Sequence, residues 1–105
     1  MRTASEHVRR WVAVLCCALA APAAQALEVF ACEPEWAALV KVLAPQARVT
    51  RATHALQDPH HIEARPALIG ALRRADLAVC TGASLEAGWL PMLQQRAGNA
   101  RVFNG

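Results

Sequence analysis

The chain contains 105 residues, of which 55% are hydrophobic and 18% are charged. This length suits one small domain rather than two. The apolar content excludes an intrinsically disordered chain, because such chains lack the apolar residues that offset the loss of chain entropy. Aromatic residues account for only 5% and Tyr is absent, so the stacking platforms of single-strand nucleic-acid binders are not expected.

The first 26 residues have the three parts of a secretory signal peptide. Three arginines lie within residues 1–10, an uncharged apolar run covers residues 11–21, and the small-residue sequence Ala24-Gln25-Ala26 follows. A positive n-region, an apolar h-region of about 7 to 15 residues and an A-x-A site define such a signal. The run is too short to span a hydrocarbon core of about 30 Å. We expect cleavage after Ala26, export and no permanent membrane span.

Much of the positive charge lies in this segment. The formal net charge of the chain is +3, and residues 1–26 hold three of the eleven Lys and Arg residues but only one of the eight Asp and Glu residues. Residues 27–105 therefore carry eight positive and seven negative charges, and Arg73-Arg74 is their only adjacent basic pair. Because nucleic-acid binding requires clustered Lys and Arg, we expect no nucleic acid as a partner.

From residue 27 onward, short strand patterns alternate with helical ones. Proline near a first turn, helical apolar spacing and short apolar runs are the signals. In chain order they predict a strand at 27–31, a helix beginning at Glu33-Pro34-Glu35 and ending before Pro45, a strand at 47–53, a polar loop at 54–65, a helix beginning at Pro66, a strand at 77–80, a helical segment at 84–96 and the start of a strand at 101–103.

The apolar spacing also predicts which side chains are buried. It gives one buried stripe on each of the first two helices, made of Trp36, Leu39, Val40 and Leu43 on the first and of Leu68, Ile69 and Leu72 on the second. The continuous apolar run 77–80 predicts a strand covered on both faces. Trp89 is expected to serve in packing.

Alternating strands and helices predict an α/β fold with a parallel sheet and right-handed crossovers. Residues 27–105 supply three or four strands at most, and a domain of this size buries a low fraction of its surface. We therefore interpret residues 1–26 as a signal peptide and residues 27–105 as an incomplete N-terminal α/β lobe. This lobe contains a partial parallel sheet with flanking helices and forms the front part of a longer protein.

The polar loop concentrates the residues with the richest chemistry. His60 and His61 lie close to the carboxylates Asp58 and Glu63, and only one other His, His54, follows residue 26. Neutral imidazole is the commonest metal ligand and suits divalent zinc. The alternative is a pair of solvent-exposed histidines without a ligand. Adjacent side chains diverge, so His60 and His61 are not expected to bind one ion together, and a complete zinc site needs further ligands.

Two motifs resemble those of a known family. The first is Asp58-Pro59-His60-x-x-Glu63 followed by Pro66, and the second is the segment 72–86 followed by Trp89-Leu90. Their residues and spacing are similar to those of the periplasmic metal-binding proteins of ABC importers for zinc and manganese, the cluster A-I solute-binding proteins. The resemblance extends from Leu27 to the end of the chain.

This resemblance implies a monomeric periplasmic receptor, not an enzyme, that carries Zn²⁺ or Mn²⁺ as cargo to the permease of an ABC importer. The family has two α/β lobes joined by a long rigid helix, with the metal in the cleft between them. Its first metal ligand is the His after Asp-Pro, which corresponds to His60. We expect His61 to be an accessory ligand and zinc to be preferred over manganese, since imidazole leans toward zinc.

Two further residues that match the family are expected to be structural rather than metal-binding. Glu63 and Glu86 match recurrent positions and are interpreted as structural groups that orient the loop. The family's further ligands, another His from the first lobe and a His and a carboxylate from the second, lie beyond residue 105.

The cysteines after residue 26 allow three interpretations. Cys32 and Cys80 are predicted at strand ends on one edge of the sheet. Free Cys usually behaves as a small buried hydrophobe, and we prefer this interpretation. The alternatives are a disulfide, which exported proteins can keep, and a zinc site shared with His60.

Two other functions compete with the metal receptor. One is a small exported thiol enzyme or metalloenzyme fragment that uses Cys32 or Cys80, although the chain after residue 26 has no C-x-x-C pair. The other is a truncated product that does not fold stably.

Overall fold

The computed structural model describes residues 4–19 and 25–102. Helix α1 (Ala4–Leu19) occupies the first of these ranges. Within the two ranges, no helix is long and apolar enough to cross a membrane. Residues 1–3 and 20–24 lie outside the described residues. They include Ala24 of the predicted cleavage site, so the signal peptide stays a prediction.

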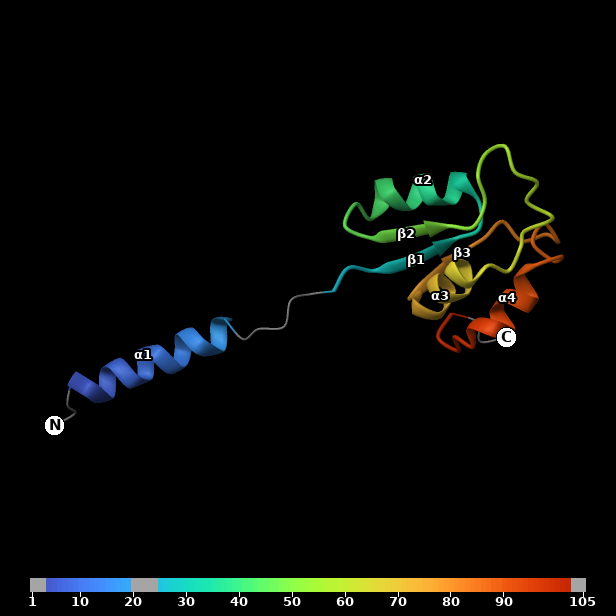
Figure 1. Ribbon diagram of the computed structural model, residues 1–105. Coiled ribbons are helices and arrows are strands. Elements are labelled where there is room, and N and C mark those ends of the chain that lie inside the picture. Colours follow the sequence, from blue (N-terminus) through green and yellow to red (C-terminus); the bar gives the residue numbers. More distant parts are fainter. Residues whose placement is uncertain (1–3, 20–24, 103–105) are drawn as a thin grey trace.

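The second range is built on a parallel sheet of three strands, β1 (Glu28–Ala31), β2 (Arg48–Arg51) and β3 (Leu77–Val79). The strand order is β2-β1-β3. In the register, Ala31 at the end of β1 pairs with Arg51 of β2 and with Val79 of β3. All three strands therefore end at the same edge of the sheet (Figure 1). This edge, the carboxyl edge, is where an α/β sheet usually binds ligands.

Helices lie on both faces of the sheet. Helix α2 (Pro34–Leu43) connects β1 to β2, and α3 (Pro66–Arg74) lies between β2 and β3. The chain thus steps from the central strand to one neighbour and then back across to the other. Right-handed crossovers require these two helices to lie on opposite faces, and Figure 1 shows α2 on one face and α3 with α4 (Leu90–Ala97) on the other. The predicted α/β fold with flanking helices is confirmed.

Local sequence signals set the helix ends. A proline lies in the first turn of α2, α3 and α4, where no backbone donor is needed. The Asn99 side-chain amide donates hydrogen bonds to the carbonyls of Leu72, Arg73 and Ala75 at the end of α3. Helix α4 ends at Gly98, whose φ of 62° is left-handed, a conformation that glycine adopts at low cost.

The hydrophobic core lies between the sheet and the layer of α3 and α4. Phe30 of β1, Leu72 of α3 and Leu93 of α4 are fully buried, and Leu68 and Trp89 belong to the same cluster. The predicted burial of Leu68, Leu72 and Trp89 is therefore confirmed. The cluster also includes Cys32 and Ala52, which follow β1 and β2, so the core reaches the carboxyl edge.

Two predicted burial patterns are wrong. In α2, Leu39 and Leu43 are 45% and 74% exposed, and Val40 is buried with Ala37. Helix α2 contacts β1 and β2, and this narrow surface covers only a thin stripe of the helix. Leu77 of β3 is also 46% exposed, because β3 is an edge strand on the side away from β2.

Two predicted boundaries also differ. The helical segment expected at 84–96 begins only at Leu90. Gly82, Ala83 and Ser84 have φ values of 78°, 52° and 71°, which a right-handed helix cannot accommodate. The strand expected at 101–103 is a turn at residues 101–102, and residue 103 lies outside the described ranges.

The preferred interpretation of the cysteines as free thiols is wrong. Cys32 and Cys80 form a disulfide, with their Cα atoms 4.9 Å apart and their positions in the sequence separated by 48. Cys32 follows β1 and Cys80 follows β3, so the parallel pairing of these strands brings the two residues together. The Cys32 amide also donates a hydrogen bond to the Val79 carbonyl at 2.9 Å. The disulfide therefore joins β1 to β3 at the carboxyl edge.

Removing this disulfide should destabilise the fold. A bond that closes a long loop restricts the unfolded chain and typically contributes about 2–4 kcal/mol. We expect the double variant Cys32→Ser, Cys80→Ser to lose free energy of unfolding in this range, measured by urea denaturation of the full chain. The matched control is Cys16→Ser, Cys17→Ser, which removes two cysteines but keeps the disulfide. Equal unfolding free energies for both double variants would contradict the assignment.

Candidate metal-binding site

The loop that carries His60 is anchored at both ends by buried residues. It leaves β2 through Ala52 and Thr53, both about 1% exposed. The Thr53 hydroxyl donates a hydrogen bond to the Cys32 carbonyl at 2.8 Å, which ties the loop to the end of β1. Later in the loop, Ile62 is buried in the hydrophobic core. The exposed residues between these anchors are thus held at the carboxyl edge.

A second contact fixes the backbone on either side of the Pro59–His60 bond. The Trp89 indole donates from Nε1 to the Pro59 carbonyl at 2.7 Å. A Cβ added at Gly88 would lie 2.8 Å from the carbonyl oxygen of His60, closer than real Cβ atoms approach. The segment 88–89 can therefore press against the loop only because residue 88 is glycine.

Asp58 braces both imidazoles of the loop. Its Oδ1 lies 2.8 Å from Nδ1 of His60, and its Oδ2 lies 3.0 Å from Nδ1 of His61. Oδ1 also accepts a hydrogen bond from the His60 backbone amide at 3.0 Å. The polar loop thus turns Nδ1 of both rings toward one carboxylate, and the expectation that the two histidines do not bind one ion together stays a prediction.

The protonation state of Asp58 determines which ring nitrogen remains available. The hydrogen bond from the His60 amide, with those from the His61 and His60 rings, holds the pKa of Asp58 well below its usual range. An ionised carboxylate only accepts hydrogen bonds, so each Nδ1 carries a proton. In a neutral imidazole the lone pair is then on Nε2. The side chains of His60 and His61 are 60% and 84% exposed, which leaves these nitrogens open to an incoming cation.

The other residues singled out from the sequence fall outside this arrangement. Glu63 and His54 are exposed, and His54 participates through its backbone in a turn with Gln57. Glu86 is 4% exposed and its carboxylate accepts hydrogen bonds from the amides of Thr81 and Gly82 at 2.8 and 3.0 Å. Glu86 therefore orients the turn after β3 rather than the loop of His60.

The sequence predicts Glu33 only as part of a helix start, and the structure gives this residue a larger role. It is 2% exposed, and its Oε2 accepts hydrogen bonds from the amide and the hydroxyl of Thr81 at 3.3 and 3.1 Å. The Thr81 hydroxyl in turn accepts a hydrogen bond from Trp36 Nε1 at 2.8 Å. No sequence pattern signals this contact, because Glu33 and Thr81 are far apart in the chain.

Glu33 and Glu86 form a buried pair with unequal pKa values. Burial, followed by the neighbouring Glu86, raises the pKa of Glu33 to about 7. Burial alone would also raise the pKa of Glu86, but hydrogen bonds from Glu33, Thr81 and Gly82 lower it below its usual range. Glu86 is therefore the charged member of the pair, and Glu33 is the member that holds a proton in weakly acidic solution.

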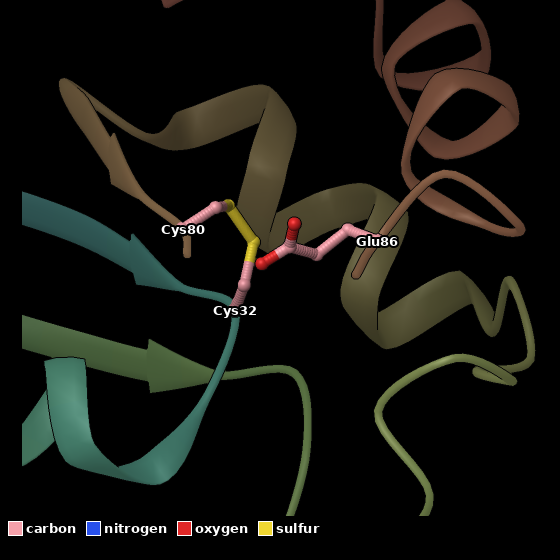
Figure 2. A group of neighbouring side chains, drawn as sticks. All are labelled: Cys32, Cys80 and Glu86. Carbon is pink, nitrogen blue, oxygen red and sulfur yellow. A yellow bond between two sulfur atoms is a disulfide. The ribbon is translucent and has the colours of Figure 1, made fainter. Parts of the chain in front are cut away.

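The two disulfide sulfurs lie next to the carboxylate of Glu86. The Sγ atoms of Cys32 and Cys80 and the carboxylate of Glu86 lie within 4.8 Å of one another (Figure 2). His60 is not part of this group, so the structure does not bring it together with the cysteines. The alternative of a shared Cys, Cys, His zinc site is not supported.

A comparison with protein families assigns the chain. The family described as zinc-uptake complex component A, periplasmic (ZnuA), matches residues 29–104. The chain belongs to this family. A comparison with curated proteins gives no match. Membership in the ZnuA family confirms the resemblance to metal solute-binding proteins that rests on Asp58-Pro59-His60, and the described sheet and helices correspond to part of such a protein. The ZnuA family is a periplasmic, non-enzymatic component of zinc uptake, with zinc as its cargo.

The contact between Gly88 and the loop can be tested directly. Gly88→Ala places a methyl group against the His60 carbonyl and forces one of the two segments to move. Overpacking of this kind costs about 1–3 kcal/mol, and the amide NMR signals of residues 58–61 should shift. Gly70→Ala is the control, because its Cβ would meet only the flexible end of Arg74. If Gly88→Ala has the same unfolding free energy as the unsubstituted chain and leaves the loop signals unshifted, the contact is contradicted.

Proposed function

We propose that the chain captures Zn²⁺ for an ABC importer and that His60 supplies the first ligand through Nε2. The observation that carries this proposal is the hydrogen bond between the Asp58 carboxylate and Nδ1 of His60. Histidines that bind metals usually donate their other ring N–H to a carboxylate, which fixes the ring and increases its basicity. The chain does no chemistry on its cargo. It binds the ion and docks on the permease of the importer.

The proposed cargo is zinc rather than manganese. Imidazole suits zinc, whereas manganese favours carboxylate, carbonyl and water ligands. In the loop, the Asp58 carboxylate is occupied by hydrogen bonds to two rings. At residues 58–61 the groups left to meet an ion are therefore imidazole nitrogens.

His61 is proposed as an accessory ligand. It shares the Asp58 carboxylate with His60 but is more exposed, at 84% of its side chain. Zinc requires three or four ligands, so one or two imidazoles from this loop form only part of a site. The remaining ligands are proposed to come from a second lobe that closes over the ion.

The proposed organisation follows from the same role. Residues 1–26 act as a signal peptide that exports the chain to the periplasm, and residues 27–105 act as an N-terminal α/β lobe. The exported receptor is proposed to act as a monomer.

The alternative of a thiol enzyme has less support. Cys32 and Cys80 are bonded to each other, and Cys32 is fully buried. A catalytic thiol must be both ionised and accessible. Titration of free thiols distinguishes the two functions, since an enzyme requires a reactive thiol after residue 26.

Calorimetric titration with Zn²⁺ tests the proposed ligand. The full chain should carry Cys16→Ser and Cys17→Ser, so that no thiol outside the disulfide binds the ion. We expect weak binding that His60→Ala abolishes. Asp58→Asn should weaken binding about 10–100-fold, the usual effect of losing the partner of a metal ligand.

The matched control is His54→Ala, which removes an exposed imidazole from the same loop and should leave the affinity unchanged. His61→Ala should have a smaller effect than His60→Ala. Zinc binding that survives His60→Ala at full strength would reject the proposed ligand.

A further inference from the structure

A second group of potential metal ligands lies at the carboxyl edge. It consists of Cys32, Cys80 and Glu86, which follow β1, follow β3 and precede α4 (Figure 2). Because β1 lies between β2 and β3, the direction in which the chain crosses the sheet reverses here. In α/β sheets such reversal points are common ligand sites.

One buried carboxylate oxygen beside this group accepts no hydrogen bond. Glu33 directly follows Cys32 and interacts with Glu86. Its Oε1 is buried and accepts no hydrogen bond from the residues that the structure describes. Buried polar atoms nearly always have a partner. A buried carboxylate oxygen that accepts no hydrogen bond, on the residue that follows Cys32 and interacts with Glu86, therefore favours a cation at this group.

We propose that reduction of the Cys32–Cys80 disulfide creates a second metal site, in which the two thiolates and Glu86 bind a thiophilic divalent cation of the Zn²⁺ type. While the sulfurs are bonded to each other, the site is closed. A dithiol reductant opens it by supplying two electrons and two protons. The S–S bond breaks, two Cys thiols form, and the dithiol is oxidised to its own disulfide. The metal then displaces both thiol protons into solvent.

The arrangement of the donors suits zinc. Zinc binds sulfur at about 2.3 Å and carboxylate oxygen at about 2.0–2.2 Å. Around one tetrahedral ion, the ligand atoms are therefore separated by roughly 3.3–3.8 Å. The donor atoms of Cys32, Cys80 and Glu86 already lie within 4.8 Å of one another, which is close to this spacing once the bond between the two sulfurs is broken. The fourth position of a tetrahedral ion remains open in this group.

Metal binding would replace the covalent link. Thiolate–metal bonds at Cys32 and Cys80 would keep the ends of β1 and β3 joined after reduction. Cys80 is half-buried and leads into the exposed residues Thr81 and Gly82, which provide a route for the reductant and the ion. His60 lies on the separate loop after β2, so this site does not depend on the proposed zinc ligand.

Titration with Co²⁺ tests the proposal. Co²⁺ occupies zinc-type sites, and its thiolate complexes show a sulfur-to-metal charge-transfer band in the near ultraviolet. The full chain with Cys16→Ser and Cys17→Ser is reduced with an excess of a phosphine and titrated with Co²⁺ alone. We expect a saturable band with one equivalent of Co²⁺ in the reduced chain and no band in the oxidised chain. A reduced chain without the band would overturn the proposal.

Variants distinguish a built site from two accidental thiols. Glu86→Gln should weaken Co²⁺ binding at least tenfold, whereas Glu63→Gln, an exposed carboxylate, should leave it unchanged. His60→Ala should keep the band, so failure here is separable from failure of the proposed zinc ligand. Cys80→Ser should lower the band intensity by about half or more. This variant tests the site independently, even if Glu86→Gln does not fold. A band that is unchanged in Glu86→Gln or in Cys80→Ser would overturn the proposal.

Discussion

The parallel pairing of β1 with both of its neighbours is the constraint on which the described structure depends. Because the three strands are parallel and their last residues pair with one another, their carboxyl ends meet at one edge of the sheet. The Cys32–Cys80 disulfide joins two of these ends, and the hydrogen bond from Thr53 to the Cys32 carbonyl joins the third. The residues with metal-binding chemistry all follow these strand ends. The sheet thus gathers side chains that are far apart in the sequence.

Two kinds of donor lie at this edge, and their environments differ. The imidazoles of His60 and His61 are exposed, with Asp58 orienting them through Nδ1. Cys32, Glu33 and Glu86 are buried, and Cys80 is half-buried. An exposed, oriented imidazole suits the capture of a cargo ion that must later be released. A covalently closed, enclosed group suits a structural link.

Much of the fold could be predicted from the sequence, because its signals are local. Pro34, Pro66 and the apolar spacing of α3 predict the helices. The alternation of strand and helix patterns predicts the parallel sheet. The wrong predictions concern properties that depend on neighbours. The exposure of Leu39 and Leu77 follows from how few strands and helices surround them, which the periodicity of one segment does not encode.

The candidate site shows the same division. His60 could be found from the motif Asp58-Pro59-His60, but the shared bracing of two rings by Asp58 depends on the turn of the loop. The disulfide and the contact of Glu33 with Thr81 join residues 48 positions apart, so no local sequence pattern predicts them. Gly88 can be singled out from the sequence because it interrupts a helical pattern. Its contact with the His60 carbonyl cannot be predicted without the structure.

The central claim is that Asp58 fixes the proton of His60 on Nδ1 and leaves Nε2 for zinc. Long-range proton–nitrogen correlation NMR of the nitrogen-15-labelled chain reports both ring nitrogens of each His. In mildly alkaline solution, where an ordinary imidazole is neutral, the account predicts a protonated Nδ1 and an unprotonated Nε2 on His60, with Zn²⁺ shifting the Nε2 signal. A proton on Nε2, or a Zn²⁺ shift confined to Nδ1, would contradict it.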